Sequence, residues 1–114
     1  MNKVYAVGVM RIDLTETYPL GKSQRLWHFF AHFEDAEKCV LENWGDMFEN
    51  YYNVALIEEH FVYDPQDITD NLVVAKQWWY EAKYEEDERD ADRIYISRID
   101  SPTNLQGIIN FWAG

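Results

Sequence analysis

The sequence has few of the residues that build disulfides, phosphate-binding loops and cationic surfaces. Its 114 residues include one cysteine, Cys39, five glycines and three prolines, and ten lysines and arginines stand against 21 aspartates and glutamates. A single cysteine excludes a disulfide within the chain and favours a reducing compartment, so we expect a cytoplasmic protein. So few glycines leave little material for a phosphate cradle.

Long apolar runs are also missing. The first residues, MNKVYAVGVMRID, contain an apolar stretch of seven residues before Arg11, which is short for a signal peptide. No run approaches the ~18 apolar residues that a membrane-spanning helix needs. We therefore expect a soluble protein with no membrane partner.

Motifs for catalysis, cofactors and metals are absent as well. No serine or threonine stands in a nucleophile elbow, and no CxxC pair occurs. His28 and His32 lie in a stretch with strand-like alternation, where a rise of ~3.3 Å per residue separates them by about 13 Å, too far to share an ion. The acids of 86–92 alternate like calcium ligands, but Ala91 replaces the required glycine and Ser97 the final glutamate. The sequence therefore predicts no catalytic, metal or cofactor site, no cofactor, and no enzyme.

The chain does contain enough apolar residues for a core, and its charge is unevenly distributed along the sequence. Apolar residues make up 47% and aromatic residues 17% of the chain, despite a net charge of −11, which is typical of a folded protein and, at this length, of one domain over 1–114. Residues 1–33 carry four cations and two acids, a net of +2, so the remaining 81 residues carry −13. Such a surface repels phosphate backbones, and we expect no direct binding of nucleic acid.

Hydrophobic periodicity predicts the order ββαβαβα. Alternation in 3–14 and 25–33 indicates two antiparallel strands, and three-and-four spacing indicates a helix from Asp35 to Tyr51. Gly45 in the middle of that helix predicts a close approach to another backbone, because glycine costs roughly 1 kcal/mol there. The later expected elements are a strand at 52–63, a helix at 71–85, a strand at 93–100 and a short helix starting at Ser101-Pro102. We expect an α+β fold with an antiparallel sheet of about four strands and helices packed on one face.

The stretch YEEDERDAD (84–92) is the densest group of acids. Carboxylates two apart on a strand or four apart on a helix lie about 6–7 Å apart, comparable with the phosphate repeat of a nucleic-acid strand. Such a row would present the charge of a backbone to a basic groove. A solvated loop that only keeps the protein soluble is the alternative interpretation, and it stays open.

Aromatic residues cluster at Trp78-Trp79-Tyr80. Consecutive residues of a helix are about 100° apart, so with Trp79 inward, Trp78 or Tyr80 faces outward. An exposed aromatic beside charged residues has the composition of a protein interface. The predicted partner-binding residues are Glu58, Glu59, Trp78, Tyr80, Glu81, Glu85, Glu86, Asp87, Glu88, Asp90 and Asp92.

In size, acidity and lack of a catalytic motif, the chain resembles the small acidic inhibitors that bacteriophages and mobile elements use against host nucleases, anti-CRISPR proteins among them. That resemblance implies a basic, nucleic-acid-binding protein as partner and occlusion of its groove as mechanism. A self-associating homodimer closed by exposed Trp and Tyr side chains is the second hypothesis. A small-ligand binder or enzyme that uses His28 and His32 on an open sheet face is the third.

Overall fold

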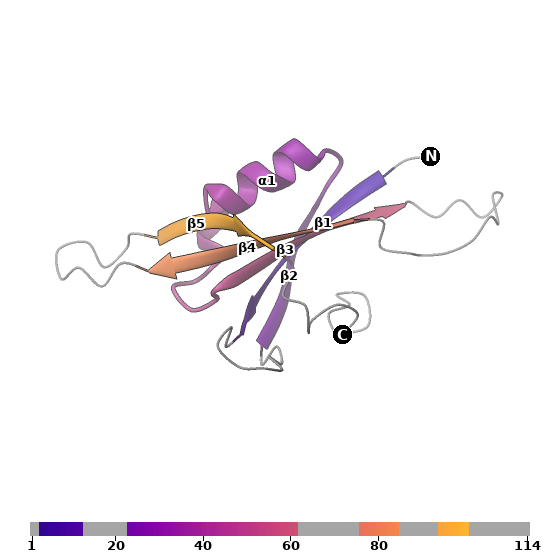
Figure 1. Ribbon diagram of the computed structural model, residues 1–114. Helices are drawn as coiled ribbons and strands as arrows, with labels where there is room; N and C mark the ends of the chain where they lie inside the picture. Colours follow the sequence, from indigo (N-terminus) through magenta and orange to yellow (C-terminus); the bar gives the residue numbers. More distant parts are fainter. Residues whose placement is uncertain (1–2, 13–22, 62–75, 85–93, 101–114) are drawn as a thin grey trace.

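A computed structural model describes residues 3–12, 23–61, 76–84 and 94–100. Five strands form one sheet in the order β2-β1-β3-β4-β5, every neighbouring pair is antiparallel, and α1 crosses one face (Figure 1). The elements are β1 (Lys3–Arg11), β2 (Ser23–Phe30), α1 (Phe33–Leu41), a 3₁₀ turn (Trp44–Asp46), β3 (Val54–Phe61), β4 (Lys76–Tyr84) and β5 (Ile94–Ile99). The α+β fold with an antiparallel sheet is confirmed. Among the described residues, no helix has the length and apolar character to cross a membrane.

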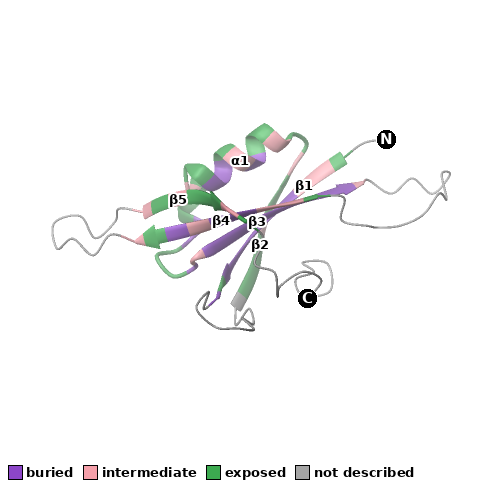
Figure 2. Cartoon of the chain, viewed as in Figure 1, coloured by how far each residue is buried: buried purple, intermediate pink, exposed green. Residues whose placement is uncertain are grey.

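The inner strands β1 and β3 are apolar on both faces. In β3, Ala55 and Ile57 pack in the cluster under α1, whereas Val54 and Leu56 pack in a second cluster on the opposite face. This follows from the period of two, which sends alternate side chains to opposite sides of a sheet. Burial is accordingly concentrated on the inner strands, and β2 and β5 are mostly exposed or half-buried (Figure 2).

The helix α1 begins near the expected place but ends at Leu41, so the prediction of a helix to Tyr51 is wrong. Its apolar stripe buries Ala36, Cys39 and Val40 against the sheet. After it, Asn43 takes a left-handed conformation with φ 50°, which asparagine tolerates better than most residues. The Asn43 side chain also accepts a hydrogen bond from the backbone N–H of Phe48 at 3.0 Å, so the chain turns instead of continuing as a helix.

Gly45 lies in that turn with φ 62°, outside the helix. A Cβ atom added there would lie 3.0 Å from the Cζ2 atom of Trp27 in β2. Gly45 is therefore required by its positive φ and by the close indole ring. The close approach that the sequence predicted involves a side chain and not a backbone.

The second predicted helix is also wrong in its described part, because residues 76–84 form β4. The segment KQWWYEAKY alternates: Tyr80 and Ala82 face α1, and Trp79 belongs to the opposite cluster. Its aromatic residues favour strands, and pairing with β3 and β5 stabilises that choice. In the described ranges the sheet therefore has five strands instead of about four. The last strand is confirmed as β5, and the helix predicted from Ser101 lies outside the described residues.

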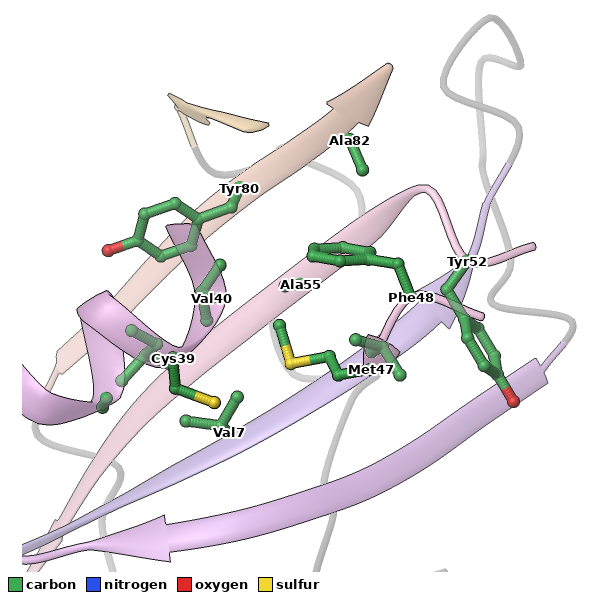
Figure 3. Packing of buried hydrophobic residues seen from close by; sticks show 12 residues of the cluster. Val7, Cys39, Val40, Met47, Phe48, Tyr52, Ala55, Tyr80 and Ala82 are labelled. Carbon is green, nitrogen blue, oxygen red and sulfur yellow. The ribbon is translucent and has the colours of Figure 1, made fainter. Parts of the chain in front are cut away.

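The main core lies between α1 and the sheet (Figure 3). Phe48 and Met47, from the segment after the helix, fill the space between the helix and the strands, and Tyr80 comes from β4. Cys39 lies in this core, and burial raises the pKa of its thiol to about 11. Cys39 is a core residue, as its position on the apolar side of the helix indicates.

Candidate protein interaction surface

Two of the predicted partner-binding acids, Glu58 and Glu59, are buried in β3, with 0% and 4% of their surface exposed. As neighbours on a strand they point to opposite faces of the sheet. Glu59 lies on the α1 side, where its carboxylate accepts a hydrogen bond from the Tyr5 hydroxyl at 3.0 Å and lies 3.5 Å from Lys3 Nζ. Burial, followed by this contact with Glu59, raises the pKa of Tyr5. Neither acid contributes to an exposed negative surface.

Glu58 has a different environment on the face away from α1. Its Oε2 atom accepts a hydrogen bond from Gln77 Nε2 at 3.1 Å, and His60 Nε2 lies 3.8 Å from Oε1. Oε1 is buried without a hydrogen bond, as is the indole nitrogen of Trp79 on the same face. Burial raises the pKa of the Glu58 carboxyl, and the contacts with Gln77 and His60 oppose that shift.

The predicted roles of Trp78 and Tyr80 also change, because both lie in a strand, β4, and not in a helix. Tyr80 is fully buried, and its hydroxyl donates a hydrogen bond to Glu37 at 2.6 Å. Burial, reinforced by Glu37, raises the pKa of Tyr80. Trp78 is half-buried, with its ring 4.4 Å from that of Phe33. Because a strand places Trp78 and Tyr80 on the same face, both turn toward α1 and neither is the exposed ring that a helix would require.

The remaining predicted residues lie on β4 or beyond it. Glu81 is half-buried and pairs with Val54 and Ser97 in the sheet. The other predicted acids lie outside the described residues: Glu85, Glu86, Asp87, Glu88, Asp90 and Asp92. Their role in binding stays a prediction.

A different group of acids is exposed in residues 34–51, which we call the acidic–aromatic segment. It contains six carboxylates and one lysine, Lys38, a net of −5. Three large apolar side chains of the same segment are exposed, Leu41 by 46%, Trp44 by 39% and Tyr51 by 50%. The exposed carboxylates are Glu34, Asp35, Glu42, Asp46 and Glu49. The sequence indicated this surface through the acids on the polar side of the helix predicted from Asp35 to Tyr51. The prediction of partner-binding residues used the denser acids of 84–92 instead.

Contacts hold the acidic–aromatic segment against β2. Glu49 accepts a hydrogen bond from Arg25 at 2.7 Å, and the Arg25 guanidinium lies 5.2 Å from the Trp27 ring. The Trp44 ring lies edge-on to Phe30 at 6.2 Å. A further ion pair within the segment, between Lys38 and Glu42, is 4.0 Å long and exposed, so it contributes little to stability. The segment thus contacts β2 and carries a negative charge and partly exposed rings.

The histidines of the third hypothesis are in exposed positions. His28 in β2 lies against the rings of Trp27 and Phe30, at 5.2 and 6.4 Å, and His32 precedes α1. Within the described ranges, no three His, Cys, Asp or Glu side chains are grouped to hold a metal ion.

No protein-family model matches the sequence, and neither the curated proteins nor the solved structures compared with it give a match. Function is therefore inferred from the residues themselves.

Proposed function

We propose that this protein is a small non-enzymatic binding module that engages a basic protein partner through the acidic–aromatic segment. The observation that carries the proposal is the net charge of −5 beside the exposed rings of Trp44 and Tyr51. Interfaces combine aromatic anchors with a charged, solvated rim, and complementary charge speeds association. Contacts with β2 through Glu49 and Trp44 reduce the conformational freedom that this surface loses on binding.

The sharpest form of this function is inhibition of a nucleic-acid-binding protein by occlusion of its basic groove, as in phage or mobile-element anti-defence. Acids one helical turn apart lie about 5–6 Å from each other, close to the spacing of successive phosphates. Glu34 and Glu37 have this spacing in α1, and Glu42 follows the helix about two turns after Asp35. The excess of 21 acids over ten cations supports the same partner chemistry and argues against direct nucleic-acid binding. A single buried thiol fits a cytoplasmic setting.

Charge reversal tests the proposal. The tagged chain should capture nucleic-acid-binding proteins from a lysate at low salt, with capture fading by about 0.5 M salt because screening is strong there. A captured protein, once purified, should lose binding to labelled DNA or RNA when the chain is added. The triple variant Glu34→Lys, Asp35→Lys, Glu42→Lys should reduce capture and competition at least tenfold.

Two further variants complete the experiment. Asp100→Lys, an exposed acid that follows β5, is the control and should leave capture unchanged. The variant with Glu85, Glu86, Glu88 and Asp90 changed to Lys measures the contribution of the 84–92 stretch. Capture that is absent at low salt, or that no acidic variant weakens, would contradict the proposed function.

A further inference from the structure

The protein holds one of its own arginines against both an indole ring and a carboxylate. The Arg25 guanidinium lies 5.2 Å from the centroid of the Trp27 ring, and its Nη1 atom donates a hydrogen bond to Glu49 at 2.7 Å. The negative face of an indole attracts a cation, and a planar guanidinium also stacks on aromatic faces and pairs with carboxylates. An indole with a carboxylate beside it is therefore a site that suits a guanidinium group.

The acidic–aromatic segment presents the same two chemical groups at Trp44. The Trp44 side chain is 39% exposed. Glu42 and Asp46, two residues before and two residues after Trp44, are exposed as well. A cation that approaches this ring therefore meets negative charge on both sides of it in the sequence.

The two exposed rings of the segment differ in whether the chain supplies a cation. The Arg11 guanidinium lies 5.8 Å from the Tyr51 ring and donates a hydrogen bond to the Tyr51 carbonyl at 3.1 Å. Within the described ranges, no lysine or arginine lies over the Trp44 ring. The lysine of the segment, Lys38, pairs with Glu42 at 4.0 Å instead. Trp44 is therefore the ring at which a cation from another molecule meets no competitor from the described chain.

The backbone around Trp44 presents the ring and a carboxylate from one turn. The Asp46 N–H donates a hydrogen bond to the Asn43 carbonyl at 3.1 Å, and both residues have a left-handed φ, 55° and 50°. The Trp44 ring lies 6.2 Å from the ring of Phe30 in β2. These contacts reduce the freedom that the ring loses when a ligand covers it.

We propose that Trp44, with Asp46 and Glu42 beside it, binds an arginine side chain of the basic partner. The guanidinium lies over the exposed part of the indole and pairs with a flanking carboxylate, as Arg25 does within the chain. This inference rests on the proposed function and deepens it, because it assigns a side-chain chemistry to the partner. Net charge attracts lysine and arginine alike, whereas a ring selects the planar, weakly hydrated guanidinium.

Two peptides of equal charge, hexa-arginine and hexa-lysine, test the inference on the full chain. NMR titrations followed at the Gly45 amide, next to the ring, report the affinity at this site. At about 0.15 M salt, hexa-arginine should bind at least threefold more tightly than hexa-lysine. Trp44→Leu keeps an apolar side chain and should weaken hexa-arginine by about threefold to fivefold, as expected of an exposed cation–π contact. The preference for arginine should then disappear.

Two further variants control the experiment. Phe29→Leu removes a ring that is 43% exposed on the face away from α1, and it should leave the preference unchanged. Asp46→Asn removes a flanking charge at a left-handed position that asparagine tolerates, and it should weaken both peptides by about twofold. Circular dichroism of each variant verifies that the fold is retained.

The outcomes separate this inference from the proposed function. Equal affinity for the two peptides in the natural chain, or a preference that Trp44→Leu retains, would overturn the arginine site and leave the acidic surface in place. Failure of both peptides to bind would contradict the arginine site and the proposed function together. In the natural chain, the Trp44 indole N–H signal, identified by its loss in Trp44→Leu, should shift more with hexa-arginine than with hexa-lysine.

Discussion

The two faces of the sheet differ in whether their buried polar groups have hydrogen-bond partners. On the face under α1, Tyr80 donates to Glu37, Tyr5 donates to Glu59, and the Tyr84 hydroxyl donates to the Tyr52 carbonyl at 2.7 Å. On the opposite face, one oxygen of Glu58 and the indole nitrogen of Trp79 are buried without hydrogen bonds. An unpaired buried polar group costs roughly 1–3 kcal/mol. The buried polar groups named on the α1 face are therefore paired, and the opposite face carries a polar cost that a substitution at Glu58 can reduce.

The largest effect is expected in the core under α1. Phe48→Ala removes a fully buried ring between the helix and the sheet and should lower the free energy of unfolding by about 3–5 kcal/mol. Leu41→Ala, at an exposed position on α1, is the control and should change stability by less than about 0.5 kcal/mol. Denaturant unfolding of both variants measures the difference. A small loss for Phe48→Ala would show that the α1 face is not the principal core.

A smaller effect is expected from the hydrogen bonds of that face. Tyr80→Phe removes the hydroxyl that donates to Glu37 at 2.6 Å and should cost about 1–2 kcal/mol, because hydrogen bonds to charged groups are among the stronger ones. Tyr51→Phe makes the same change at a half-exposed ring and should be nearly neutral. Thermal unfolding of the two variants compares them. Equal melting temperatures would mean that the hydroxyl of Tyr80 adds nothing to the pairing of this face.

The smallest effect, and the one with opposite sign, concerns the other face. Glu58→Gln should raise stability by about 1 kcal/mol at pH 8, because a neutral amide avoids the burial of a charge and still accepts the Gln77 hydrogen bond. The matched change on the α1 face, Glu59→Gln, loses the ion pair with Lys3 and should lower stability by less than about 1 kcal/mol. A gain in stability for Glu58→Gln and a loss for Glu59→Gln would show that the two faces of the sheet differ in how well they accommodate a buried carboxylate.

The pH dependence of Glu58 has a definite direction. Its pKa is raised in the folded state, so the folded chain holds the proton more tightly than the unfolded chain. The contribution of this site to stability therefore falls as pH rises from the ordinary carboxyl range through the raised pKa. The free energies of unfolding of the natural chain and of Glu58→Gln, plotted against pH, should converge at low pH and separate as pH rises. Parallel curves would show that the pKa of Glu58 is the same in the folded and the unfolded chain.

Local patterns predicted four of the five strands in the described part of the chain, because β1, β2, β3 and β5 alternate in a way that needs no partner to be recognised. The segment KQWWYEAKY satisfied two patterns at once. Trp79 and Ala82 are three apart, as on a helix, whereas Trp78, Tyr80 and Ala82 alternate, as on a strand. Only pairing with β3 and β5 selects the second pattern.

The candidate surface was less predictable than the strands. Glu58-Glu59 indicated an exposed acidic field, because carboxylates are rarely buried. Both are buried because β3 has neighbours on both sides and clusters on both faces. The acidic–aromatic segment was visible only as the polar side of a helix. Its contact with β2 through Arg25 and Trp44 depends on residues far apart in the sequence.

By itself, the sequence determined that the chain builds an antiparallel α+β core, keeps one inert thiol in it and carries an excess of negative charge, since composition and short-range periodicity act within a few residues. Tertiary structure decided which acids are buried, which rings remain exposed and which strand forms the edge. Those outcomes depend on the neighbours that each strand acquires, and burial and pairing are properties of neighbours brought together by the whole fold.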